Sequence, residues 1–212
     1  MQLILVRHGN TFEEGSPSVW LGNKMNLPLT SKGVSQAETL GPFLKNLRIP
    51  VAAIYTGPLV RQRQHGAILA RALGKSESEI LVDDRLREID YGTWEGKSDE
   101  VLRQEGQKAQ LEAWSTDAVW PTDGAWGEDE QSVETRVDDF LASAERCAGE
   151  HVTLLGVTSG GTLRYFYKRA VHNRSDDVRQ TKVATGNVCG LYLQSASWKV
   201  LFWNIPPTDV PI

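Results

Sequence analysis

Short apolar runs alternate along the chain with longer stretches in which apolar residues recur every three or four positions. A continuous apolar run is typical of a strand covered on both faces, and the three- to four-residue recurrence is typical of an amphipathic helix. The runs predict strands at Gln2–Val6, Val51–Tyr55, Ile80–Val82, Val152–Val157, Val188–Gln194 and Lys199–Trp203. The third is short and predicts an edge strand.

The segments between these runs have helical spacing and end at residues that favour helix termini. Thr30 or Ser31 is the natural N-cap of the first helix, and Gly74 and Gly149 each follow a predicted helix end. The predicted helices are Ser31–Leu47, Leu59–Leu73, Glu100–Trp114, Asp129–Ala148 and Gly160–Arg169.

Strands that alternate with helices predict an α/β fold: a three-layer sandwich with a mostly parallel central sheet and helices on both faces. The 212 residues suit one domain spanning 1–212. The least regular stretch, about 92–127, is rich in Trp, Gly and acidic residues and predicts a small inserted cap. Such a cap would lie over the carboxyl ends of the strands, where these folds bind ligands.

The composition and net charge of the chain limit the kinds of ligand and the cellular location that we expect for this protein. The net charge of -4 argues against a nucleic-acid partner, which needs a basic surface, but permits a small anionic ligand held by a few arginines. No apolar run is long enough to span a membrane and the first residues lack a signal-peptide pattern, so we expect a cytoplasmic protein. The two cysteines are expected to be reduced thiols, and the four scattered histidines predict neither a metal site nor a cofactor. The apolar tail 206–212 is compatible with a homodimer.

Four segments carry candidate chemistry. Arg7, His8, Gly9 and Asn10 follow the first strand, and Arg61 stands at the start of the helix after the second. The other two segments are Arg85–Gly96, which contains Glu88, and Gly156–Thr162, whose small residues present backbone amides to an anion. Each has an ordinary structural explanation by itself: an incidental histidine, a surface arginine, a salt-bridge partner or a tight turn.

Taken in this order, the segments resemble the histidine phosphatase (phosphoglycerate-mutase-like) superfamily over nearly the whole chain. The resemblance rests on Arg7-His8-Gly9, on Leu21-Gly22 with Leu27-Pro28-Leu29-Thr30, on Pro58-Leu59 with Arg61, on Glu88 with Gly92, Trp94, Glu95 and Gly96, and on Gly127-Glu128 with Arg136. It implies a phosphomonoester hydrolase of the histidine acid-phosphatase type that acts on a small phosphorylated metabolite.

The resemblance also implies a role for each site residue. His8 would form a phosphohistidine, and Arg7 and Arg61 would hold the phosphoryl oxygens, which is the positioning and charge stabilisation that phosphoryl transfer needs. Glu88 would protonate the leaving oxygen and then activate water. Asn10, Ser159 and Gly160 are the remaining phosphate-binding candidates.

Ser159 is the main departure, because the family carries a second histidine at this position. Loss of one transition-state donor predicts a rate lower by about 10²–10³-fold. The substitution is compatible with an engineered inactivation, with an enzyme adapted to serine, or with a phosphate-binding relative of little activity. Smaller departures are Asn26 for an aspartate, Gly57 for a serine and His65 for a threonine.

Several alternatives remain. Phosphoglycerate-mutase-type transfer is the first, although Tyr91–Gly96 is closer to the phosphatase pattern; a non-catalytic regulatory protein is the second. A serine hydrolase at Ser159 is excluded because the first glycine of a nucleophile elbow is missing. Trp20, Trp114, Trp120 and Trp126 either line a pocket for an apolar substrate portion or simply cover a small core. Arg164, Lys168 and Arg169 are expected on a solvated helix face.

Overall fold

A six-stranded sheet forms the centre of the computed structural model, which describes residues 1–46, 50–123, 125–147, 152–171 and 181–209. The strands are β1 (Gln2–Arg7), β2 (Val51–Thr56), β3 (Ile80–Val82), β4 (Thr153–Thr158), β5 (Val188–Gln194) and β6 (Ser197–Ile205), in the order β3-β2-β4-β1-β5-β6. Strands β1 to β4 are parallel, β5 is antiparallel to β1, and β6 is antiparallel to β5. The predicted strands are confirmed, with β3 at an edge.

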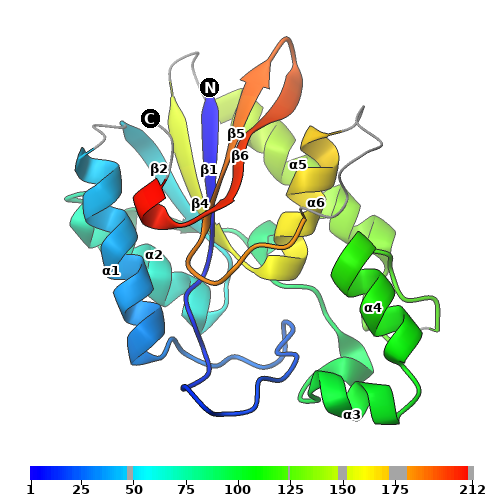
Figure 1. The fold of residues 1–212 in the computed structure, drawn as a ribbon. Coiled ribbons are helices and arrows are strands. Elements are labelled where there is room, and N and C mark those ends of the chain that lie inside the picture. Colours follow the sequence, from blue (N-terminus) through cyan, green and yellow to red (C-terminus); the bar gives the residue numbers. More distant parts are fainter. Residues whose placement is uncertain (47–49, 124, 148–151, 172–180, 210–212) are drawn as a thin grey trace.

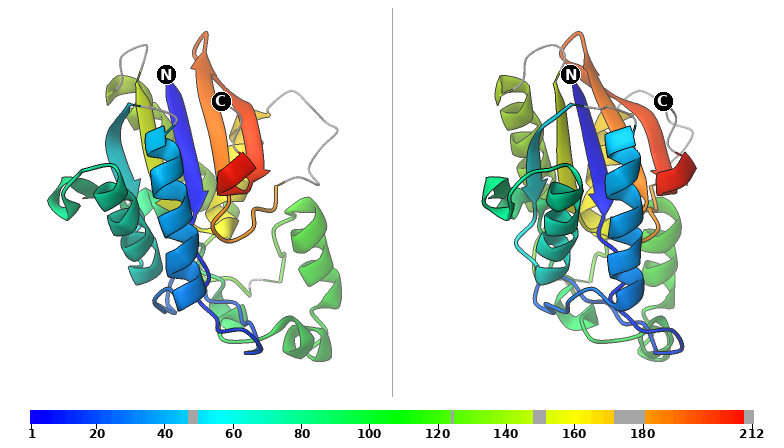
Figure 2. Two further views of the ribbon diagram at one scale, coloured as in Figure 1. Left: turned by 60° about the vertical axis from the view of Figure 1, so that its left-hand side comes forward. Right: turned by 90° about the vertical axis from the view of Figure 1, so that its left-hand side faces the viewer.

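Helices cover both faces of this sheet. Helices α1 (Ser31–Asn46) and α2 (Val60–Ala72) lie on one face, and α5 (Glu130–Cys147) and α6 (Gly160–Ala170) lie on the other (Figure 1, Figure 2). Side chains alternate along a strand, so β1 contributes Ile4 and Val6 to the apolar cluster under α1 and α2 and Leu3 and Leu5 to the cluster under α5 and α6. The three-layer α/β fold predicted from the sequence is confirmed.

The segment predicted as one helix over Glu100–Trp114 forms two helices, α3 (Asp99–Gln104) and α4 (Lys108–Asp117). Gly106 separates them with a φ of 85°, a left-handed conformation that glycine adopts without steric cost and that ends a helix. Both helices lie beyond the carboxyl ends of the parallel strands, next to the loop that follows β1 (Figure 1). The prediction of a single helix is therefore wrong, while its apolar residues Leu102, Leu111 and Trp114 are buried.

The first residues of the helices agree closely with the predicted N-termini. Thr30 caps α1, since its Oγ1 accepts a hydrogen bond from the Gly33 amide at 3.2 Å. Helix α5 begins at Glu130, one residue later than predicted; Leu47 and Gly149, the predicted boundary residues of α1 and α5, lie outside the described residues. Within the described ranges, no helix is both long enough and apolar enough to cross a membrane.

Candidate active site

His8 follows β1 at the carboxyl edge of the sheet and is held in one tautomer. Its Nδ1 lies 2.9 Å from the carbonyl oxygen of Gly9, which can only accept, so Nδ1 carries the hydrogen. Its Nε2 accepts a hydrogen bond from Arg61 Nε at 3.1 Å. Burial, and then the positive charges of Arg61 and Arg7, lower the pKa of His8 well below its ordinary value. The imidazole is therefore neutral, and its Nε2 lone pair faces the guanidinium of Arg61.

Two arginines flank His8 from different elements. Arg61, in the first turn of α2, is only 1% exposed and donates from Nη1 to Met25 O at 2.8 Å and from Nη2 to Gly22 O at 2.7 Å. Arg7 donates from Nη1 to Val183 O, and its buried Nε has no partner among the described residues. Burial lowers the pKa of both guanidiniums, while the negative charge of Glu88 opposes this shift. Each arginine is thus fixed by backbone carbonyls with donors left for an anion.

Glu88 lies against the amino terminus of α6. Its Oε1 accepts from the amides of Ile89 at 2.9 Å and Thr162 at 3.2 Å, and its Oε2 accepts from the amide of Gly161 at 3.2 Å. The amides predicted to bind an external anion therefore bind this carboxylate instead, an arrangement that the helix dipole favours. Gly161 is required here, because a Cβ would lie 2.6 Å from Glu88 Oε1 and 2.2 Å from the hydroxyl of Tyr91.

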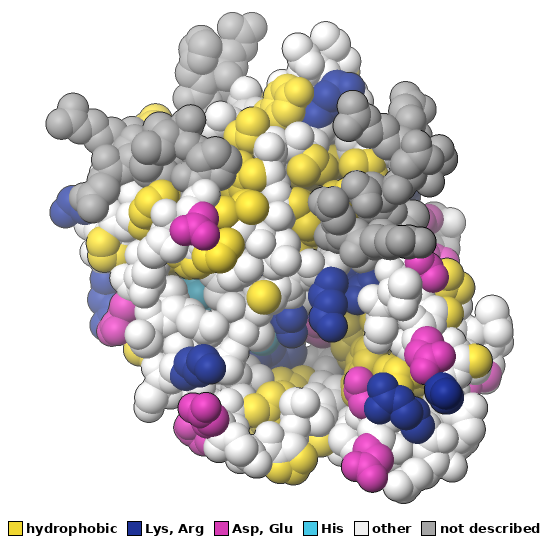
Figure 3. All heavy atoms as spheres, viewed as in Figure 1, with side chains coloured by type: hydrophobic (Ala, Val, Ile, Leu, Met, Phe, Trp, Pro, Cys, Tyr) yellow, Lys and Arg dark blue, Asp and Glu magenta, His cyan; other side chains and the backbone are white. Residues whose placement is uncertain are grey.

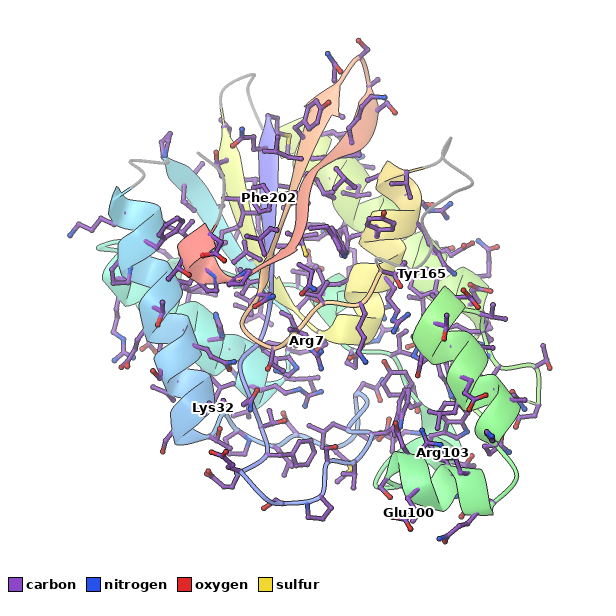
Figure 4. The ribbon with its side chains drawn as sticks, viewed as in Figure 1. Arg7, Lys32, Glu100, Arg103, Tyr165 and Phe202 are labelled. Atoms are coloured by element: carbon purple, nitrogen blue, oxygen red, sulfur yellow. The ribbon has the colours of Figure 1, made fainter. Side chains whose placement is uncertain are left out.

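A cavity of about 520 Å³ brings these groups together. Figure 3 shows a hollow below the centre of this face, with Lys and Arg side chains beside it, and Figure 4 places Arg7 at the carboxyl end of β1 and Lys32 at the start of α1. Of the residues predicted from the sequence, the cavity is lined by Arg7, His8, Asn10, Trp20, Arg61, Glu88, Trp114 and Gly160. Ser159, Trp120 and Trp126 do not line it.

Ser159 lies beneath this cavity rather than facing it. Its side chain is fully buried, and its Oγ accepts a hydrogen bond from Gln62 Nε2 at 3.0 Å. Gly160, the next residue, lines the cavity under the Arg7 guanidinium. In this structure the Ser159 hydroxyl is therefore engaged by Gln62 and does not line the cavity.

Of the four tryptophans predicted near the site, two line the cavity and two pack behind them. Trp20, from the loop after β1, and Trp114, from α4, line the cavity. Trp126 is 8% exposed and packs edge-to-face on Trp114 and Trp120 with ring centroids 4.8 and 4.5 Å away. Trp120 and Trp126 therefore support the wall from behind, in the edge-to-face geometry that aromatic pairs prefer.

Arg164 is buried, so the prediction that it lies on a solvated basic face of α6 is wrong. Its side chain is 6% exposed, lines the cavity, lies 4.8 Å above the Trp114 ring and donates from Nη1 to Trp114 O at 2.9 Å. Lys168 pairs with Glu130 at 2.9 Å, and Arg169 contacts acidic residues of α5. The sequence contained a signal for this placement: Arg164 follows Gly160 by four positions and so lies on the same side of the helix.

The smaller departures have identifiable contacts. The Asn26 side-chain oxygen accepts from the Val60 amide at 2.7 Å, at the start of α2. His65 is fully buried, and its Nδ1 accepts from the Gly9 amide at 3.1 Å, beside His8. His151 and His172, the other two histidines, lie outside the described residues.

The two buried histidines predict a pH-dependent stability. Burial lowers the pKa of His65 to about 3, and that of His8 is also lowered, whereas both histidines of the unfolded chain titrate near their ordinary value of 6.5. Below that pH the unfolded state binds protons that the folded state excludes, so the free energy of unfolding falls as pH falls, by about 1.4 kcal/mol per pH unit and histidine. We expect His65→Asn to remove one histidine's share of this slope in denaturant titrations between pH 5.5 and 4.5. Equal slopes for the two proteins would contradict the prediction.

The described part of the chain contains no group of three or more His, Cys, Asp or Glu side chains that could hold a metal ion.

Comparison with known proteins agrees with this geometry. Residues 3–206 match the model of the histidine phosphatase superfamily (branch 1). A protein named probable phosphoglycerate mutase GpmB, from Salmonella choleraesuis, is 33% identical over 145 residues, which are 68% of this chain and 62% of that protein. The match thus spans less than two thirds of this relative's length.

Solved structures share the fold. Bacillus stearothermophilus YhfR superposes with a TM-score of 0.78 at 26% identity, over 96% of both chains. A mycobacterial glucosyl-3-phosphoglycerate phosphatase in complex with VO3 has a TM-score of 0.80 at 24% identity, over 96% of this chain and 98% of that one. The alpha-ribazole phosphatase from Shigella flexneri has a TM-score of 0.74 at 21% identity, over 97% of both chains.

Proposed function

Because this chain belongs to branch 1 of the histidine phosphatase superfamily, we propose that it is a phosphomonoester hydrolase that acts on a small phosphorylated metabolite through a phosphohistidine at His8. One observation carries the proposal: a neutral His8, fixed with its Nε2 lone pair beside Arg61, shares a cavity with Arg7 and Glu88. Nucleophile, charge stabilisation and an acid–base group are the three components that this reaction needs.

In the first step, Nε2 of His8 attacks phosphorus, and the bond from phosphorus to the ester oxygen breaks. Arg7 and Arg61 neutralise the charge that gathers on the nonbridging oxygens. Glu88 acts as the acid in this step, its protonated form favoured by the negative charge of the bound phosphate, and it gives its proton to the leaving oxygen, which releases an alcohol. The hydrogen bond from His8 Nδ1 to Gly9 O steadies the positive charge that the ring acquires.

In the second step, a water molecule attacks the phosphohistidine. Glu88, now a carboxylate, takes a proton from that water while the N–P bond breaks, which yields inorganic phosphate and restores the protonated acid and the free imidazole. Since the lowered pKa of His8 keeps the ring neutral in mildly acidic solution, the reaction extends below pH 6.5.

We further propose that Ser159 stands where other members of the superfamily carry a second histidine. Ser159 is bonded to Gln62 and buried under the cavity floor. Charge stabilisation then rests on Arg7 and Arg61, and we expect a modest turnover rather than an inert site.

The apolar side chains that line the cavity favour hydrolysis of a larger ester over phosphoglycerate-mutase-type transfer. Trp20, Trp114 and Phe12 give the space beyond His8 an apolar side, and Arg164 closes it above Trp114. We propose a substrate whose alcohol portion carries an apolar or aromatic group, because such walls bind apolar surface better than a short polar chain such as glycerate.

The test is phosphate release from a panel of monoesters that runs from glycerol phosphate and phosphoglycerate to esters of larger apolar alcohols. We expect stoichiometric alcohol and inorganic phosphate, with kcat/KM highest for the apolar esters. Replacing Trp20 and Trp114 together by Ala should reduce that preference by at least about 10-fold, since one methylene group in a hydrophobic pocket is worth about 1–3 kcal/mol.

Two outcomes would contradict this proposal. Phosphoryl exchange between phosphoglycerates without phosphate release would identify a mutase, and phosphate binding without turnover would identify a regulatory protein. If the double Trp substitution leaves the preference for apolar esters unchanged, the proposed role of the apolar wall is wrong, while the proposed hydrolase activity still stands.

A further inference from the structure

Gln62 is a fully buried amide whose polar atoms are all used in one orientation. Its Nε2 donates to Leu86 O and to Ser159 Oγ, both at 3.0 Å, and its Oε1 accepts from the Leu59 amide at 3.0 Å. The opposite amide orientation would place Oε1 against the Leu86 carbonyl, so the contacts fix the side chain.

The two acceptors of Gln62 belong to the segments that place Glu88. Leu86 precedes Glu88 by two residues, and Ser159 is the N-cap of α6, whose amides at Gly161 and Thr162 hold the Glu88 carboxylate. A single side chain of α2 therefore joins the backbone before Glu88 to the helix terminus that binds it.

The neighbouring residue Arg61 connects the same helix to the nucleophile, since its Nε donates to His8 Nε2 at 3.1 Å. Adjacent residues at the start of α2 thus contact the His8 side and the Glu88 side of the cavity. Gly57 makes room for this arrangement, because a Cβ at that position would lie 2.1 Å from Gln62 Oε1.

We propose that Gln62 is a positioning residue for the acid–base step: it holds Glu88 at the leaving oxygen, and Ser159 serves as its hydrogen-bonding partner rather than as a phosphate ligand. This inference rests on the proposed hydrolase function. It also explains two departures from the family pattern together, because Gly57 and Ser159 both lie in contact with the Gln62 amide.

The inference makes a prediction about leaving groups. Protonation matters most when an alkoxide leaves and little when a stabilised phenolate such as 4-nitrophenolate leaves. We expect Gln62→Met, which keeps the length but removes the donors, to lower kcat/KM, which reports the step in which the alcohol leaves, by about 10²-fold on an alkyl phosphate and by less than about 5-fold on 4-nitrophenyl phosphate. The Kd of inorganic phosphate should stay near the wild-type value, because Arg7 and Arg61 are untouched.

His65 supplies a matched control on the same helix. It is equally buried and donates nothing to the Glu88 side, but its Nδ1 holds the Gly9 amide beside His8. His65→Leu should therefore lower the rates on both esters by the same factor, because the nucleophile is needed whatever the leaving group. Glu88→Gln should reproduce the unequal losses of the Gln62 variant.

The outcomes separate the inference from the function on which it rests. Unequal losses for Gln62→Met and equal losses for His65→Leu support the inference. Equal losses for both variants, in a wild-type enzyme that His8→Ala inactivates, overturn the role of Gln62 and leave the function standing. If Gln62→Met fails to fold, Gln62→Leu removes the donors without burying a charge, and the same comparison applies. A wild-type protein without His8-dependent turnover would overturn both proposals.

Discussion

His8→Ala should abolish phosphate release, with kcat lower by about 10⁴-fold or more, because in the proposed mechanism every turnover begins with the Nε2–P bond. The alanine variant has no atom at the position of Nε2, and the only other described histidine, His65, is fully buried with its Nδ1 bonded to the Gly9 amide. The measurement is the initial rate on the preferred monoester, together with covalent phosphate on the protein after rapid alkaline quenching. Wild-type protein should carry acid-labile phosphate during turnover, and His8→Ala none.

Thermal unfolding provides the control for this variant. His8 is 5% exposed, but among the described residues its side chain hydrogen-bonds only to Gly9 and Arg61, so the variant should stay folded. Residual turnover within 10-fold of the wild type in a folded His8→Ala protein would falsify the phosphohistidine route. Water would then attack the substrate directly, and Glu88 would be the base to test next.

The second large effect is expected for Arg61→Ala. Its guanidinium donates to His8 Nε2 and to two carbonyls of the loop after β1, and it is positioned to hold a phosphoryl oxygen. Removing one such donor typically costs 10²–10³-fold, and loss of loop order adds to this, so we expect kcat/KM to fall by roughly 10³-fold. Arg61→Lys should recover only part of the loss, since an ammonium cannot reproduce the planar fork.

The pH profile of these variants tests the electrostatic part of the argument. After burial, the positive charge of Arg61 is the largest cause of the lowered pKa of His8. Without that charge the pKa of His8 rises, so the ring is protonated at a higher pH and the acidic limb of kcat/KM moves upward. Arg61→Lys keeps the charge and should keep the limb near its wild-type position. An acidic limb that does not move in Arg61→Ala would show that burial alone keeps His8 neutral.

The sequence by itself determined the layers of the fold. Strand β1 reads as an unbroken apolar run, because Ile4 and Val6 face one helical layer while Leu3 and Leu5 face the other. It also brought His8, Arg61 and Glu88 into one site, since parallel strands end at the same edge of a sheet and each of these residues follows such an end or the helix after it. Where a single residue controlled the backbone, as Gly106 does between α3 and α4, the periodicity of apolar residues gave no warning.

Only the tertiary structure decided which side chains face the cavity. Arg164 is a cation on a helix whose buried residues extend around most of its surface, and contacts with α4 rather than its own neighbours bring it inside. The same holds for Ser159: the resemblance implied that it binds phosphate, and packing buries its hydroxyl in a hydrogen bond from Gln62. Motif spacing fixes where a backbone atom lies along the chain, but the direction of a side chain depends on which residues from other elements occupy the space around it, and those come together only when the chain is folded.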